Sequence, residues 1–111
     1  MTVKEMAQTL GLTIFTGEEG LEKEIKGGYT SDLLSDVMGY ADAGHVWITL
    51  QTHKNVMAVA SLKELAAVIL VKGFAPDEDT AELARQEQIS ILGTTEQAFE
   101  LSGRLYRLLH P

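Results

Sequence analysis

Five consecutive polar residues between two apolar runs are the part of the chain best suited to binding a small molecule. These residues are Gln51, Thr52, His53, Lys54 and Asn55. If a helix starts here, its free backbone amides attract an anion, and His53 or Lys54 adds positive charge. The alternative is that Thr52 caps the helix and the other side chains are only solvated. We therefore treat this segment as a candidate ligand-binding site.

Two further segments carry candidate ligand-binding residues. Lys72 and Gly73 lie where the apolar run Ala66–Lys72 ends. With Gly73 at positive φ, this turn wraps a ligand and directs Lys72 toward a phosphate; the alternative is an ordinary turn after a strand. Thr94 and Thr95 come next after another apolar run, where they either cap a helix or contact the same ligand.

No group of residues predicts catalysis. Histidine is the side chain most suited to acting as a general base near neutral pH, and His53 is the one candidate. Such a base needs a positioned partner, and no Ser-His-Asp or Cys-His arrangement can be assigned around it. Cysteine is absent, the three histidines are far apart, and the acidic run Asp77–Asp79 is expected at a helix start. We expect no catalytic residue, no cofactor and no metal ion.

The elements that position these residues follow from three apolar runs. The runs are His45–Gln51, Ala66–Lys72 and Ile89–Gly93, and helix-like segments separate them. Strands that alternate with helices predict βαβ units and a parallel sheet. Ligands of such sheets bind beyond the carboxyl ends of the strands, which is where the candidate residues lie. The predicted fold class is α/β: a single small domain over residues 1–111, with a mainly parallel βαβ sheet flanked by helices.

One segment between the first two runs has two interpretations. Asn55–Ala60 could be a strand, because a capping-box pattern for a later helix follows it. We favour a helix from His53 to Lys63 and a strand over Ala66–Val71. The latter run is β-branched and precedes a polar cluster, which is the usual order of strand, loop and helix start.

The segments on either side carry their own signals. Thr2 and Glu5 form a capping box for a helix over Val3–Leu10, and Leu12–Phe15 is expected to be a strand. Leu21–Tyr29 alternates imperfectly and fits a half-exposed strand or an extended arm. We expect the later helices to be capped by Thr30 or Ser31, by Asp77 or Asp79, and by Thr94 or Thr95.

Composition and charge restrict the class of protein. The 111 residues suit one domain, and their 45% hydrophobic content is typical of a globular chain. A net charge of −7 with scattered basic residues argues against a nucleic-acid partner. The absence of cysteine is compatible with a reducing compartment, and no secretory signal or membrane-spanning apolar stretch is present. We expect a cytoplasmic protein that binds neither nucleic acid nor membranes.

The last helix carries more apolar residues than one core-facing stripe needs. They are Phe99, Leu101, Leu105, Tyr106, Leu108 and Leu109. A surplus apolar face on a small domain often marks a partner surface, and most oligomers are symmetric homo-oligomers. We expect a homodimer whose interface includes Leu101, Leu105, Tyr106 and Leu109. The helix over Ser31–Ala41 is an equal candidate for this interface.

The order of these motifs resembles the DRTGG domain, a regulatory module of phosphotransacetylases, of certain CBS-containing inorganic pyrophosphatases and of small free-standing proteins. The motifs are WITLQ, THKN, VMAVASLKEL, AAVILV, KGFAPDEDT and ISILGTTEQAF. Upstream, LEKEIKGGYTSDLLSD resembles the leading strand of that domain and the helix after it. The main resemblance spans residues 21–105, and residues 1–20 add a helix and a strand. It implies an α/β fold of this type and a regulatory role.

The chain departs from the family at the two turns for which the domain is named. The turn that usually carries Asp-Arg reads Thr52-His53, and the Thr-Gly-Gly turn reads Val71-Lys72-Gly73. The pattern looks like the free-standing subfamily, whose serine-kinase label reflects similarity to the N-terminal domain of HPr kinase. The topology is also similar to the UDP-binding domain of Mur ligases. The kinase label does not transfer, because the chain has no P-loop string and no eukaryotic-type kinase motifs.

Three functions are consistent with this sequence. The first is a non-catalytic regulatory or scaffolding module that acts through self-association and contact with a larger enzyme. The second is a sensor that binds a nucleotide or another phosphorylated metabolite at the polar strand ends. The third is an enzyme that depends on His53, which is the least favoured.

Overall fold

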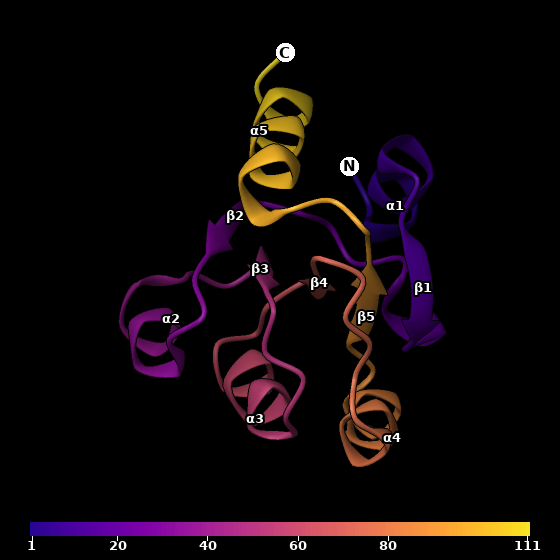
Figure 1. Cartoon of the computed structure of the whole chain (residues 1–111), viewed down its shortest axis with the longest axis vertical. Coiled ribbons are helices and arrows are strands. Elements are labelled where there is room, and N and C mark those ends of the chain that lie inside the picture. Colours follow the sequence, from indigo (N-terminus) through magenta and orange to yellow (C-terminus); the bar gives the residue numbers. More distant parts are fainter.

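The computed structural model describes all residues from Met1 to Pro111, and one five-stranded sheet organises them (Figure 1). The strands are β1 (Thr13–Thr16), β2 (Gly27–Thr30), β3 (His45–Thr49), β4 (Ala67–Leu70) and β5 (Ser90–Gly93). The helices are α1 (Val3–Leu10), the 3₁₀ turn η1 (Glu18–Gly20), α2 (Leu34–Tyr40), α3 (Asn55–Leu62), α4 (Glu78–Glu87) and α5 (Ala98–Leu109). The strand order is β1-β5-β4-β3-β2. The strands from β2 to β5 are parallel to their neighbours, and β1 is antiparallel to β5.

The elements form three layers. Helices α2, α3 and α4 cover one face of the sheet, and α1 and α5 lie on the other face (Figure 1). Each of these layers has its own apolar cluster against the sheet. Alternate residues of β4 point to opposite clusters: Ala67 and Ile69 face α1 and α5, while Val68 and Leu70 face α3 and α4. Full burial of a valine, leucine or isoleucine side chain contributes about 1.5–3 kcal/mol, which explains the nearly continuous apolar runs of these strands.

The antiparallel strand β1 is positioned by a turn that only glycine can form. Gly17 has φ +83°, and a Cβ atom there would lie 2.3 Å from the carbonyl oxygen of Ile89. The Ser90 hydroxyl donates a hydrogen bond of 2.6 Å to the carbonyl oxygen of Gly17. This close backbone contact holds the end of β1 against the start of β5.

Helix α1 begins with the predicted capping box. The Glu5 amide donates to the Thr2 hydroxyl at 3.2 Å, and the Thr2 amide donates to the Glu5 carboxylate at 2.9 Å. The hydrogen bond from the Thr2 amide is the main reason why the pKa of Glu5 is lowered. Gly11 ends the helix in the left-handed conformation, with φ 68°.

The predicted fold class and element order are confirmed. The favoured interpretation of the ambiguous segment is correct, because Asn55–Leu62 is helical and Ala67–Leu70 is a strand. In the segment Leu21–Tyr29, residues 21–22 form a turn, residues 23–26 lead into β2, and residues 27–29 belong to β2; Thr2 and Glu24 form an isolated bridge.

The predicted helix caps of α2 and α4 are only partly correct. Helix α2 begins at Leu34, and the Ser31 hydroxyl accepts instead from the Leu33 amide at 3.2 Å in the preceding turn. Asp77 occupies the N-cap position of α4, although its side chain makes no capping hydrogen bond. Hydroxyl and carboxylate side chains also bond to nearby backbone in turns, so their presence predicts a helix start only to within a few residues.

Candidate functional site

The candidate ligand-binding residues gather at one edge of the sheet, as predicted. Strands β3, β4 and β5 are adjacent and parallel, so the segments that follow them lie beside one another. The Thr52 carbonyl oxygen accepts from the Asp77 amide at 3.2 Å and from the Thr80 hydroxyl at 2.8 Å. These contacts tie the β3–α3 loop to the start of α4.

The start of α3 differs from the predicted anion site. Thr52 does not cap the helix, which begins at Asn55. The Asn55 amide donates to Nδ1 of His53 at 3.1 Å, and the Val56 amide donates to the His53 carbonyl oxygen at 3.0 Å. The Met57 amide donates to the Lys54 carbonyl oxygen at 2.9 Å. The amides that would hold an anion are therefore occupied, and His53 acts as a hydrogen-bond acceptor for the helix start.

A ligand-binding crevice is expected between the β4–α4 loop and the β5–α5 loop. The chain turns to one face of the sheet after β4 and to the other face after β5 (Figure 1), and ligands of open α/β sheets bind between such diverging loops. Here two hydrogen bonds join the loops: Lys72 amide to Glu96 carbonyl at 2.8 Å, and Gly73 amide to Thr94 carbonyl at 2.9 Å. The crevice is closed by the chain's own backbone.

The turn has a positive φ angle at Gly73, as predicted, and also one at Lys72, which was not predicted. Gly73 has φ +77°, and Lys72 also has positive φ, at 61°. A non-glycine residue in this region is uncommon and strained. The side chain of Lys72 is exposed, as are those of His53, Lys54 and Asn55.

Thr94 and Thr95 do not cap the last helix. The N-cap residue of α5 is Gln97, whose side chain makes no capping hydrogen bond. The Thr94 hydroxyl instead accepts from the Glu96 amide at 3.1 Å, and the Thr95 side chain is exposed. Glu96 also forms an ion pair with Arg104 of α5. Thr94 and Glu96 therefore form hydrogen bonds within the turn, and Glu96 also joins it to α5.

Asp32 is a residue of this edge that the sequence did not identify. Its carboxylate accepts from the Thr49 hydroxyl and from the Leu50 amide, both at 2.9 Å. The Gln51 side-chain amide donates to the Asp32 carbonyl oxygen at 2.9 Å. The partners lie on another strand, so local patterns gave no signal for this role.

The loop that carries Asp32 is fixed by a second contact. The Trp47 indole N–H donates to the Ser31 carbonyl oxygen at 2.7 Å. The Trp47 side chain is fully buried, and its N–H therefore requires this partner. This hydrogen bond and those of the Asp32 carboxylate together hold the β2–α2 loop against the end of β3.

The predicted interface residues of α5 divide into two groups. Leu101 and Leu105 are buried in the cluster between α5 and the sheet, so they cannot form a surface, and their assignment to an interface is wrong. Leu109 is half-buried against the same cluster. Tyr106 and the neighbouring Phe99 are exposed, at 66% and 84%. The exposed aromatic side chains of α5 are therefore on its outer face.

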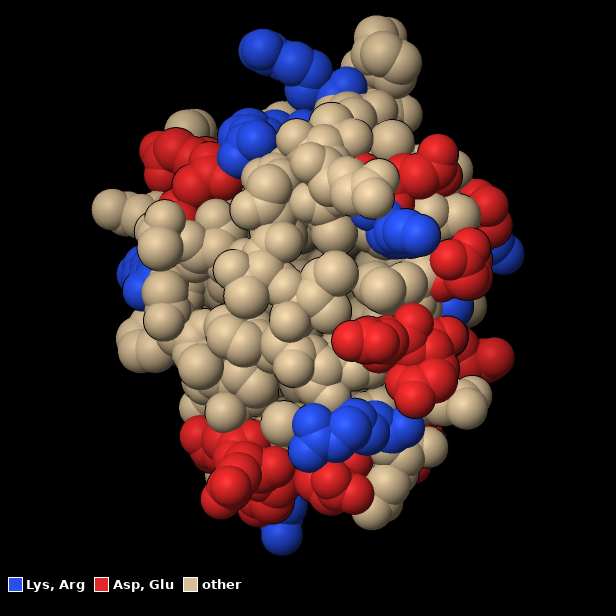
Figure 2. Space-filling model, turned by 90° about the vertical axis from the view of Figure 1, so that its right-hand side faces the viewer, with Lys and Arg blue, Asp and Glu red and all other residues tan.

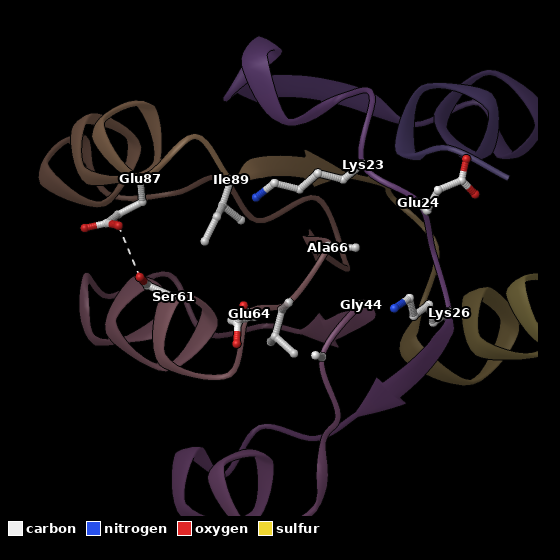
Figure 3. Close-up of a pocket in the computed structure, with 11 residues that line it drawn as sticks. Lys23, Glu24, Lys26, Gly44, Ser61, Glu64, Ala66, Glu87 and Ile89 are labelled. Carbon is white, nitrogen blue, oxygen red and sulfur yellow. Dashed lines mark hydrogen bonds between the residues drawn. The ribbon is translucent and has the colours of Figure 1, made fainter.

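Two other features of the surface fall outside the predicted site. A cavity of about 460 Å³ lies at the opposite edge, near the amino ends of β3, β4 and β5 (Figure 3). Lys23, Lys26 and Glu64 line it, and the Ser61 hydroxyl donates to the Glu87 carboxylate at 3.1 Å beside it. Partial burial lowers the pKa of Lys23. The lining of this cavity carries both positive and negative side chains, and none of the predicted site residues is among them.

The second feature is the edge strand β1. Figure 2 looks onto this side of the molecule, where an uncharged area lies between charged groups at its rim. Ile14 and Phe15 of β1 are 42% and 38% exposed. The pairing of β1 with β5 shifts register between Ile14 and Thr16, which marks a bulge. Bulges at edge strands hinder pairing with another strand.

With this geometry described, the comparison with known proteins places the chain in a family. Residues 5–108 match the DRTGG domain, so the chain belongs to the DRTGG domain family. The match includes the first helix and strand, which lie outside the predicted range of 21–105. No functionally curated protein matches the chain in sequence.

A solved structure shares the fold. It contains the CBS and DRTGG domains of the regulatory region of the Clostridium perfringens pyrophosphatase, complexed with the activator diadenosine tetraphosphate. The similarity has a TM-score of 0.72 at 18% sequence identity and covers 94% of the present chain. The chain spans 45% of the length of that structure.

Two structural findings concern other classes of site. The structure has no group of three or more His, Cys, Asp or Glu side chains placed to hold a metal ion. None of its helices has the length and hydropathy needed to cross a bilayer.

We predict that Asp32→Ala lowers the free energy of unfolding by about 1–3 kcal/mol, since the buried Thr49 hydroxyl loses its acceptor. Urea denaturation measures this difference. Asp32→Asn keeps an oxygen acceptor for both donors and is the matched control, with a clearly smaller expected loss. Equal losses in the two variants would contradict a hydrogen-bonding role for Asp32.

Proposed function

We propose that this protein is a non-catalytic regulatory module that associates with itself and with a larger enzyme. The observation that carries the proposal is the outer face of α5, where Phe99 and Tyr106 are exposed at 84% and 66%. Aromatic side chains are enriched at protein interfaces, and contiguous exposed apolar patches often mark an interaction site. Membership of the DRTGG family supports a regulatory role, since the similar solved structure is part of the regulatory region of an enzyme.

The local geometry of His53 also supports a non-catalytic role. Its Nδ1 atom accepts the Asn55 amide, so the neutral ring carries its proton on Nε2 in this arrangement. The acceptor lone pair that a general base would use is engaged with the backbone. The ring serves the start of α3.

Contact with an enzyme can be tested with a photo-reactive residue on the proposed surface. We predict that p-benzoylphenylalanine in place of Phe99, incorporated in cells, crosslinks to an enzyme whose kcat or KM changes when the purified protein is added. The same residue in place of Leu62 on α3 is the control, because Leu62 is also exposed but lies on the other face of the sheet. Crosslinks no stronger than those of the control, or an enzyme with unchanged kinetics, would contradict the proposal.

A second candidate function is a sensor of a nucleotide or another phosphorylated metabolite. The observation that favours it is the pair of diverging loops after β4 and β5, with the exposed cation Lys72 on the first of them and Lys54 on the neighbouring β3–α3 loop. The similar regulatory region binds a nucleotide activator, which gives the class of ligand to try first. Binding between the loops requires the amides of Lys72 and Gly73 to leave their carbonyl partners.

For the sensor, we predict that diadenosine tetraphosphate, ATP or AMP raises the melting temperature. A ligand at about 100 times its Kd adds about 2.7 kcal/mol of stability. For a domain of this size each kcal/mol raises Tm by about 4–8 °C. The shift should disappear in Lys72→Ala and persist in Lys4→Ala, which removes an exposed lysine on α1. No shift with any of these ligands, or an equal loss in both variants, would contradict binding at this edge.

A further inference from the structure

Gly103 occupies a position on α5 where nothing within the chain requires a glycine. It lies in the middle of the helix, and no heavy atom comes within 4 Å of the place where its Cβ would be. Glycine is among the least favourable residues in a helix interior, second only to proline. The missing side chain leaves the helix backbone open to a close approach from outside.

Two exposed aromatic residues lie beside Gly103. Phe99 precedes it by four residues and Tyr106 follows it by three, so both are on the same face of the helix. The Tyr106 ring stacks on His110 with 4.3 Å between the ring centroids, which fixes its orientation. A hollow of about 650 Å³ lies over this face, and both aromatic residues and Gly103 line it.

The charges around Gly103 form a self-complementary pattern. Glu100 is near the amino end of α5 and Arg107 near its carboxyl end, and neither forms an ion pair within the chain. A helix turns by about 100° per residue. This rotation places Phe99 and Tyr106 on one flank of Gly103, and Glu100 and Arg107 on the other flank.

We propose that α5 packs against α5 of a second copy of this chain, antiparallel and with the crossing point at Gly103. This inference rests on the proposed self-association and gives it a geometry. In an antiparallel helix pair with two-fold symmetry, corresponding flanks face each other. Phe99 of one copy then lies beside Tyr106 of the other, and Glu100 of one copy lies beside Arg107 of the other.

The pattern identifies a second copy as the occupant because the same residues supply both halves of each contact. An interface with two-fold symmetry needs such a self-complementary surface. The two glycines allow the helix axes to approach at the short end of the usual 8–10 Å range. A helix of 12 residues is about 18 Å long, so this contact is small for a specific interface. The dimer is therefore expected to dissociate on dilution.

Sedimentation velocity of the full chain over a wide range of protein concentration tests the proposal. The wild type is expected to change from monomer to dimer as the concentration rises. Gly103→Leu, Glu100→Arg and Arg107→Glu should each raise the dimer dissociation constant by about tenfold or more, the effect of losing a central interface contact. Glu78→Arg is the matched control, since it makes the same charge change in the first turn of α4 and should leave the dissociation constant unchanged.

Charge exchange distinguishes the antiparallel geometry from any other use of this face. Each charge-reversal variant alone places like charges opposite each other. The double variant Glu100→Arg/Arg107→Glu restores opposite charges and should dimerise like the wild type. An equimolar mixture of the two single variants should form a heterodimer, because both charge pairs are then attractive.

A wild type that stays monomeric at every concentration would overturn the proposal. Dimers that persist in Gly103→Leu, or single variants that neither recover in the double variant nor form a heterodimer, would overturn it as well. Circular dichroism and urea unfolding of each variant verify that the fold is retained. A monomeric wild type would not remove the proposed enzyme contact, which the crosslinking and kinetic experiment tests separately.

Discussion

Burial of β4 on both faces is the constraint on which the rest of the structure depends. All four residues of this strand are buried, and their alternation divides the core into two clusters. Each cluster needs a layer of helices to exclude water from it. Helices α2, α3 and α4 supply one layer as the connections between the parallel strands, and α1 and α5 supply the other (Figure 1). The α1–α5 layer has only two helices, so α5 contributes Leu101 and Leu105 to the core and presents its remaining face to the outside.

This division of α5 links the fold to the proposed function. The inner stripe of the helix, with Leu101 and Leu105, is buried against the sheet and is not available for an interface. The outer face keeps Phe99 and Tyr106 exposed around an unneeded glycine. The proposed contact surface would account for these exposed aromatic residues, whereas helix stability alone would favour another residue at position 103.

The carboxyl edge of the sheet is held closed by its own polar groups. The backbone amides of Lys72 and Gly73 donate to the next loop, and those of Asn55 and Val56 donate to His53. An edge with satisfied amides is stable without a ligand, and a ligand would have to replace these hydrogen bonds. For this reason we propose the outer face of α5, and not the carboxyl edge of the sheet, as the main binding surface of the protein.

The sequence predicted the parts of this structure that depend on local and periodic signals. The apolar runs located β3, β4 and β5, because burial on both faces favours apolar residues and leaves only a few polar ones, such as Thr49 and Ser90, whose hydroxyls are hydrogen-bonded. The candidate residues were correctly placed at one sheet edge, since parallel strands end together. The role of Asp32 was missed, because its partners on and after β3 come together only in the folded chain.

The errors on α5 have a different physical cause. Leu105 and Tyr106 are both apolar enough for an interface, and only the angle at which the helix lies on the sheet decides which one is buried. Thr94 and Thr95 matched the pattern of a helix cap, whereas the Thr94 hydroxyl bonds within the turn before the helix. The sequence pattern alone does not decide how the helix lies on the sheet, or which nearby backbone amide a threonine hydroxyl binds.

The pairing of α5 with a second copy can be measured most directly with one cysteine, because the chain has none of its own. At the crossing point of an antiparallel pair, Gly103→Cys in the two copies brings the Cα atoms within the roughly 4.4–6.8 Å that a disulfide spans. Mild oxidation of this variant is predicted to give a disulfide-linked dimer rapidly and in high yield. Ala58→Cys, exposed on α3, provides the rate of random encounters. A linked dimer that forms no faster at position 103 than at position 58 would contradict the proposed surface.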